Sequence, residues 1–198
     1  MNILKLTSEN KDKIIKKVVG CLRNKQIVIL PFDTVYGFAC DATASEAVLE
    51  IFKLKIRPLN QTIGVAVSDF KNFQQISRDL DLDNENFISE KIPGKYTFIV
   101  KNNPNNNIAA ECIKNETIGI RVPKSDFVLK IIRDFGGVIA QTSANKSGMA
   151  NCYSIEEIMT QYDSMFLDDV VIVDGGKIEN NSPSQIFDLT NDNPKKIR

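Results

Sequence analysis

Chemically active side chains gather in two short stretches of the sequence. Leu30–Phe38 supplies an aspartate and a threonine hydroxyl, and Lys55–Pro58 supplies a lysine and an arginine. The apolar run Ile27–Leu30 predicts a buried strand that stops at Pro31, so the aspartate and the threonine follow its carboxyl end. Ligands of open α/β sheets bind at such ends. These groups suit an anionic substrate, and the alternative is a strand–loop–helix connection that is merely polar.

Two further predicted strands end in polar side chains. Arg121 closes a strand that begins near Thr117, and Ser143 and Asn145 follow another strand. If these strands run parallel to the one before Thr34, all these groups lie along one edge of the sheet. Each also has a purely structural interpretation, as an ion-pair partner or as a group that closes a turn by hydrogen bonding.

Several common catalytic and nucleotide-binding devices are missing. The chain has no histidine, which excludes Ser-His-Asp and Cys-His schemes and histidine metal sites. There is no G-x-G-x-x-G fingerprint, and Gly175-Gly176-Lys177 lacks two residues of a P-loop, so it is interpreted as a hairpin turn. The four cysteines are widely spaced, which favours buried reduced thiols over a zinc site or a disulfide framework.

Composition bounds the class of protein. The chain has 198 residues, of which 42% are hydrophobic and 25% are charged, and this predicts one globular domain over residues 1–198. The 25 basic and 25 acidic residues balance, which argues against a dedicated nucleic-acid-binding protein. No apolar run approaches the ~20 residues of a membrane helix, and lysines interrupt any signal-peptide pattern near the amino terminus. We therefore expect a cytoplasmic protein.

Helix and strand patterns alternate over most of the chain. They predict an α/β fold, a single domain with a twisted sheet of mixed direction flanked by helices. Capping boxes are expected at Thr43 with Glu46 and at Ser154 with Glu157. The helix after Thr43 should end near Lys55, because Pro58 restricts the residue before it. On a terminating turn, the cations of Lys55 and Arg57 can converge.

Six short motifs follow one another along nearly the whole chain: Leu30–Gly37, Lys55–Pro58, Pro93–Thr97, Ile118–Pro123, Thr142–Gly148 and Pro183–Asp188. In the same order, they resemble the motifs P-T-[DE]-T-V-Y-G, K-x-R-P, P-G-P-[LV]-T, [VL]-[AG]-[VI]-R-x-P, [TP]-S-A-N-x-S-G and P-S-x-[IV]-x-D. These motifs are typical of the YrdC-like family of threonylcarbamoyl-AMP synthases in its short, single-domain form.

The resemblance implies a nucleotidyltransferase that makes threonylcarbamoyl-AMP and pyrophosphate from L-threonine, bicarbonate and ATP. The product serves threonylcarbamoyl modification of the tRNA adenosine beside the anticodon, and it would pass to a tRNA threonylcarbamoyl-transfer complex. Lys55 and Arg57 would be catalytic. By the family pattern, ATP would lie near Lys55, Arg57, Thr117, Asn145 and Ser184, and threonine near Thr34, Arg121 and Ser143.

No metal ligands are expected in the chain, and Mg²⁺ would be carried with ATP. Two positions depart from the family: Phe32 replaces the first threonine of P-T, and Ala66 stands where many longer members have histidine. The rival interpretation is a double-stranded RNA or tRNA-binding module without catalytic activity. The balanced charge disfavours it and predicts at most weak direct tRNA binding. A third interpretation is a structural or regulatory protein with a degenerate site, which Phe32 and Ala66 keep open.

Overall fold

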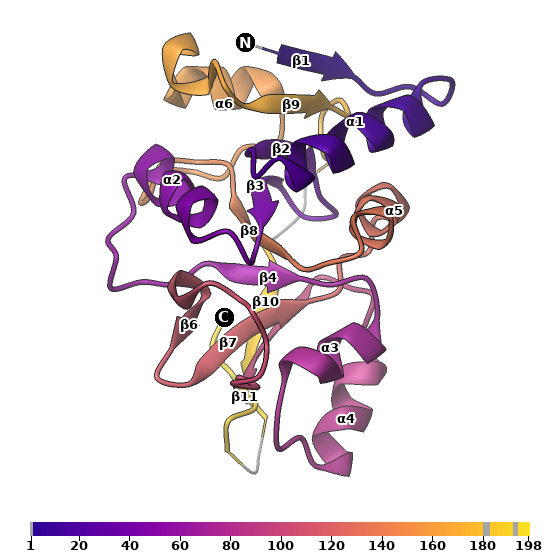
Figure 1. Ribbon diagram of the computed structural model, residues 1–198, viewed down its shortest axis with the longest axis vertical. Coiled ribbons are helices and arrows are strands. Elements are labelled where there is room, and N and C mark those ends of the chain that lie inside the picture. Colours follow the sequence, from indigo (N-terminus) through magenta and orange to yellow (C-terminus); the bar gives the residue numbers. More distant parts are fainter. Residues whose placement is uncertain (1, 180–182, 192–193) are drawn as a thin grey trace.

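The computed structural model describes residues 2–179, 183–191 and 194–198, and Figure 1 shows its elements along one large sheet. The helices are α1 (Lys11–Arg23), α2 (Ser45–Lys55), α3 (Phe70–Ile76), α4 (Leu82–Ser89), α5 (Asp126–Phe135) and α6 (Ile155–Gln161), with 3₁₀ turns η1 (Ala110–Cys112) and η2 (Ser164–Leu167). The strands are β1 (Asn2–Lys5), β2 (Val28–Pro31), β3 (Tyr36–Asp41), β4 (Gly64–Ala66), β5 (Tyr96–Lys101), β6 (Ile113–Lys114), β7 (Thr117–Arg121), β8 (Ile139–Ser143), β9 (Val171–Asp174), β10 (Gln185–Asp188) and β11 (Lys195–Lys196).

The sheet has mixed direction, as the alternation of patterns predicted. Its strand order is β1-β9-β2-β3-β8-β4-β7-β5-β10-β11, and β6 pairs with β7. Parallel pairs join β1 to β9, β9 to β2, β4 to β7 and β5 to β10, whereas β3 and β8 are antiparallel to both their neighbours. The fold class is therefore confirmed.

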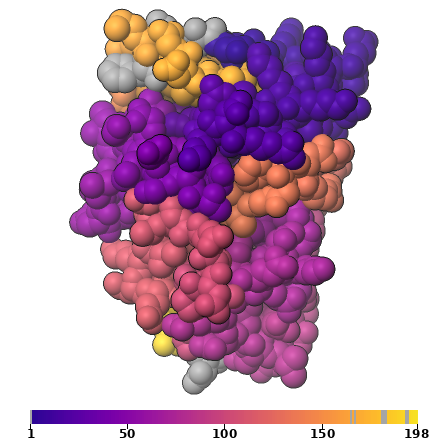
Figure 2. All heavy atoms as spheres, in the orientation of Figure 1, coloured from indigo at the N-terminus to yellow at the C-terminus, as the bar shows by residue number. Residues whose placement is uncertain are grey.

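Each face of the sheet has its own apolar cluster. On one face, α2, α3, α4 and α6 pack on strand residues that include Phe38, Val65, Phe98 and Ile120. On the other, α1 and α5 lie side by side over strands that include β2 and β9, as Figures 1 and 2 show, with Ala39 among the residues beneath them. The remainder of that second face, over β8, β4, β7, β5 and β10, carries a cavity instead.

Local signals explain most helix boundaries. The apolar stripe of α1 is buried from Ile14 to Leu22, with lysines on the opposite side of the helix. The hydroxyl of Ser125 caps α5, which ends at Gly136 with φ +76°, and the hydroxyl of Ser154 caps α6. The capping box predicted at Thr43 is wrong, because that hydroxyl donates to Asp41 Oδ1 instead. No helix in the described part of the chain has the length and apolar character to cross a bilayer.

Three further expectations differ from the structure. No strand was expected over Tyr36–Asp41, yet β3 lies in the middle of the sheet. The turn after β9 is no hairpin, because β9 pairs with β1 and β2 while β10 pairs with β5 and β11 far along the sheet. The strands that end at Arg121 and Ser143 are not parallel, since β4 runs parallel to β7 and antiparallel to β8. The polar strand ends therefore do not share one edge.

Candidate functional site

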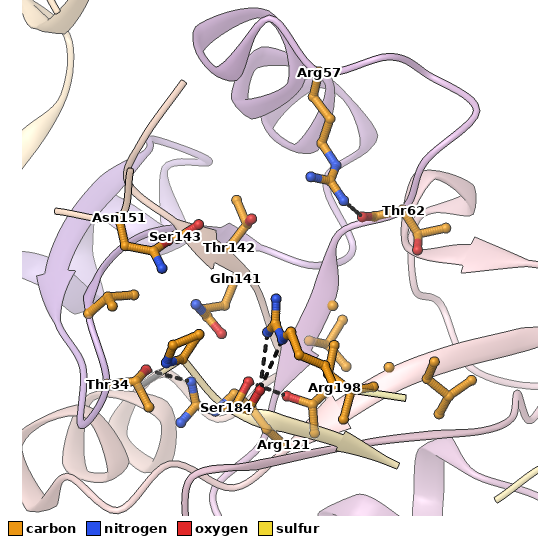
Figure 3. Close-up of a pocket in the computed structure, with 18 of the residues that line it drawn as sticks. Thr34, Arg57, Thr62, Arg121, Gln141, Thr142, Ser143, Asn151, Ser184 and Arg198 are labelled. Atoms are coloured by element: carbon orange, nitrogen blue, oxygen red, sulfur yellow. Dashed lines mark hydrogen bonds between the residues drawn. The ribbon is translucent and has the colours of Figure 1, made fainter. Parts of the chain in front are cut away.

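A cavity of about 420 Å³ lies on the second face of the sheet. Gly64 on β4 and Gly119 on β7 lie opposite each other beneath the cavity. Because glycine has no side chain, these two positions leave the space above the sheet unfilled. Gln141 and Ser143 of β8 line one side, and Ser184, before β10, lines another (Figure 3). Its volume falls within the range of about 300–1,000 Å³ usual for small-molecule sites.

The charged side chains among the described residues that line the cavity are all positive. Its lining includes four cationic residues, Arg57, Lys114, Arg121 and Arg198, and no aspartate or glutamate among the residues described. The whole chain has a net charge of zero, so this distribution is local. A wall of cations and hydroxyl groups suits a polyanionic ligand. No cluster of histidine, cysteine, aspartate or glutamate in the described residues could hold a metal ion.

Arg121 brings the loop after β2 to the cavity. Its Nη2 donates to Asp33 Oδ1 at 2.6 Å, its Nη1 donates to Thr34 Oγ1 at 3.4 Å, and both charged side chains are 4% exposed. Burial lowers the pKa of Arg121, and the neighbouring Asp33 opposes that shift. Thr34 and Arg121 thus meet as predicted, although β2 and β8 run opposite to β7. Asp33 was expected at this end of the sheet as a group facing a substrate, but it pairs with Arg121 instead and occupies part of its guanidinium.

Lys55 and Arg57 diverge instead of converging. Ile56, between them, has φ +51° and turns the chain sharply after α2. Arg57 lines the cavity, where its Nη2 donates to the carbonyl of Thr62 at 2.7 Å (Figure 3). Its Nε is buried without a partner, and burial lowers the pKa of its guanidinium. Arg57 is therefore placed to donate to a ligand.

Lys55 is 2% exposed and is not among the cavity-lining residues. Its Nζ donates to the carbonyls of Ser143 and Asn145, at 2.6 and 2.7 Å, and to Asn145 Oδ1 at 3.2 Å. Burial, and to a lesser extent Arg57, lowers the pKa of Lys55 to about 7. The three acceptors place Lys55 beneath the loop that follows β8, where it supports the loop's shape.

Of the remaining predicted site residues, some line the cavity and one lies behind it. Ser143, Thr117 and Ser184 line the cavity. Asn145 lies behind it, since its Oδ1 accepts from Ser143 Oγ at 2.6 Å and its Nδ2 donates to Met149 O at 2.7 Å. The structure therefore brings Thr34, Arg57, Thr117, Arg121, Ser143 and Ser184 to the cavity, and it leaves Lys55 and Asn145 one layer below.

Arg198 was missed by sequence reasoning. Its Nε and Nη2 donate to the carbonyl of Ser184, at 3.3 and 3.2 Å, and the residue lines the cavity (Figure 3). Gln141 and Asn151 are further polar lining residues that carried no motif signal. The lone terminal arginine offered no pattern either, because its place depends on β10 pairing with β5.

Both positions that depart from the family pattern hold buried side chains. Phe32 is 3% exposed and Ala66 is fully buried, and both belong to the apolar cluster under α1 and α5. Gly37 makes room for Phe32, because a Cβ at Gly37 would lie 3.0 Å from the phenyl ring. Neither residue lines the site.

Comparison with known proteins assigns the family. The sequence model of the Sua5/YciO/YrdC family, described as "Telomere recombination", matches residues 20–198. This chain belongs to the Sua5/YciO/YrdC family. Among similar members, a putative threonylcarbamoyl-AMP synthase of Methanocaldococcus jannaschii is 29% identical over 200 residues, covering all of this chain and 91% of that protein. The mouse (Mus musculus) threonylcarbamoyl-AMP synthase is 30% identical over 185 residues, covering 89% of this chain and 62% of the mouse protein.

A solved member of the family shares the fold. The structure of P. abyssi Sua5 complexed with L-threonine superposes on all of this chain with a TM-score of 0.88 at 24% identity. This chain covers 56% of that protein. This Sua5/YciO/YrdC chain therefore spans little more than half the length of some relatives and nearly the whole length of others.

Proposed function

We propose that this Sua5/YciO/YrdC protein is a threonylcarbamoyl-AMP synthase. It would convert L-threonine, bicarbonate and ATP into L-threonylcarbamoyladenylate and pyrophosphate. The observation that carries the proposal is the cavity lined by four cationic residues and no carboxylate side chain among those described. The similar proteins from M. jannaschii and mouse carry the name threonylcarbamoyl-AMP synthase, the former as putative, which supports the same activity.

The chemistry needs little from a general base. The threonine amine attacks the carbon of bicarbonate, and loss of water leaves an anionic carbamate. A carbamate oxygen then bonds to the α-phosphorus of ATP, while the bond from that phosphorus to the bridging oxygen breaks and pyrophosphate leaves. The absence of histidine is compatible with this route, because the nucleophile already carries negative charge. What remains for the protein is positioning and charge stabilisation.

The charges of the cavity suggest where ATP lies. Arg57, Lys114 and Arg198 form no ion pair with any described carboxylate, so their charge is available to the triphosphate. Thr117, Ser143 and Ser184 add hydroxyl groups to the same lining. Lys55 and Asn145 would contribute to ATP binding by holding the loop of Ser143. Mg²⁺ would arrive with ATP and be bound mainly by phosphate oxygens and water.

Arg121 marks the opposite end, where L-threonine would lie. Its charge is compensated by Asp33, which makes Arg121 less attractive to phosphate than Arg57 or Arg198, neither of which pairs with a described carboxylate. The buried Nε of Arg121 has no partner and could donate to the substrate carboxylate. Thr34 and Ser143 offer hydroxyl groups nearby. P. abyssi Sua5, which has the same fold, binds L-threonine, and this supports L-threonine as the substrate.

Pyrophosphate release tests the proposal. Purified protein should release pyrophosphate from ATP and Mg²⁺ only when L-threonine and bicarbonate are both present, and the adenylate should be detected by mass spectrometry. L-Serine and glycine in place of L-threonine serve as substrate controls. Equal release without an amino acid would identify a pyrophosphohydrolase and contradict the proposal. In the proposed function, L-threonylcarbamoyladenylate would serve tRNA modification through a threonylcarbamoyl-transfer complex.

A further inference from the structure

One loop surrounds the guanidinium of Arg121 with three consecutive side chains. The ring centroid of Phe32 lies 5.9 Å from its Cζ, Asp33 Oδ1 lies 2.6 Å from its Nη2, and Thr34 Oγ1 lies 3.4 Å from its Nη1. The second oxygen of Asp33 accepts the backbone N–H of Lys124 at 3.0 Å. Asp33 therefore ties the loop after β2 both to the end of β7 and to the backbone just before α5.

Asp33 sits behind Arg121 rather than in the cavity. Arg121 lines the cavity and Asp33 does not. A buried guanidinium without a counter-charge is strongly disfavoured, so the carboxylate stabilises Arg121 in this place. Arg121 also has few alternative positions, because two of its three nitrogens are already engaged. Its Nε, buried without a partner, is the donor left for a ligand.

We infer that Asp33 is the positioning residue that orients Arg121 toward the amino-acid carboxylate. The inference rests on the proposed function for the identity of the substrate. The geometry of the Asp33–Arg121 pair does not depend on it. Asp33 would not touch substrate, and its effect would pass entirely through Arg121.

A double-mutant cycle tests whether Asp33 acts through Arg121. Asp33→Asn keeps a neutral acceptor but removes the charge that holds Arg121, so the KM for L-threonine should rise about tenfold or more, which is the scale of one lost charge-assisted hydrogen bond. The KM for ATP should change less than about threefold. In the Arg121→Lys background, which itself should raise the KM for L-threonine, the Asp33→Asn change should have little further effect, because its target is gone.

Asp69→Ala is the control for loss of stability. Asp69 caps α3, where its Oδ1 accepts the N–H of Asn72 at 2.9 Å, and it does not line the cavity. Its removal should lower the melting temperature while leaving the ratio of the two KM values unchanged. If Asp33→Asn does not fold, Asp33→Glu retains the charge and displaces the carboxylate by one methylene, and it should give the same selective rise.

A spectroscopic measurement keeps the inference separate from the proposed function. In ¹H–¹⁵N spectra without substrate, the Nε–H of Arg121, assigned by its loss in Arg121→Lys, should exchange slowly with water. Asp33→Asn should accelerate that exchange, and Asp69→Ala should not. Failure of wild-type protein to release pyrophosphate would overturn the proposed function alone. Unchanged Nε–H exchange, an unchanged or lower KM for L-threonine, or additive effects in the cycle would overturn the role of Asp33.

Discussion

Two cations that are close in sequence have different surroundings in this protein. Arg57 reaches the cavity, and Lys55, two positions earlier, ends beneath the loop of Ser143 and Asn145. Sequence reasoning could predict that both lie near the end of α2, because Pro58 follows. It could not predict which would face a ligand, since that depends on the left-handed conformation of Ile56. An isoleucine gives no signal for such a turn.

Arg57→Ala should slow adenylate formation by roughly 10²-fold or more, because a preorganised cation would be lost from the transferring phosphate. Steady-state pyrophosphate release measures the effect, and thermal unfolding checks that the fold survives. Arg78→Ala is the matched control, since Arg78 pairs with Glu116 at 3.0 Å and does not line the cavity. Near-normal turnover of Arg57→Ala would mean that Lys55–Arg57 only ends helix α2 and has no catalytic role.

At the scale of elements, the end of α2 shows what a sequence pattern leaves open. The N–H of Arg57 bonds to the carbonyl of Phe52 at 2.8 Å and that of Ile56 to Lys53 at 3.0 Å, which together close the helix around Ile56. Glycine is the usual residue at such a left-handed position. Other boundaries, such as Ser125 before α5 and Gly136 after it, follow ordinary capping chemistry, and the cap at Ser154 was predicted from the sequence.

Ile56→Gly should therefore stabilise the protein, contrary to the usual effect of glycine near a helix. Relief of the left-handed strain is worth about 1–2 kcal/mol, partly offset by the greater freedom of glycine in the unfolded chain. The side chain of Ile56 is 71% exposed, so little packing is lost. Urea unfolding measures the change. Leu59→Gly is the control, because Leu59 is 72% exposed and has no positive φ. A lower midpoint for Ile56→Gly than for wild type would contradict this account.

At the scale of the whole molecule, alternating patterns predict the fold class but not the order of strands. The buried run of β3 was missed because it follows β2 after a short loop and reads as part of the motif at Thr34. The cavity depends on distant pairings, such as β7 with β5 and β5 with β10. Those pairings bring Arg198 beside residues that precede it by more than half of the chain, and no local pattern could indicate that.

The distribution of charge over the whole molecule bears on tRNA. Outside the cavity, α1 exposes Lys13, Lys16 and Lys17, and α1 is the indigo segment at the upper right of Figure 2. With a net charge of zero, direct tRNA binding should be weak, and it should fall steeply between 50 and 200 mM salt because only phosphate contacts contribute.

Fluorescence anisotropy with labelled tRNA measures this affinity. Lys16→Glu with Lys17→Glu should remove most residual binding at low salt, whereas pyrophosphate release without tRNA should stay at the wild-type rate, because neither lysine lines the cavity. The double variant Lys71→Glu with Lys91→Glu changes the net charge equally at positions away from α1 and should bind better than the α1 variant. A submicromolar complex that persists at high salt would instead favour a dedicated RNA-binding role, since contacts to bases and apolar surfaces do not weaken with salt as phosphate contacts do.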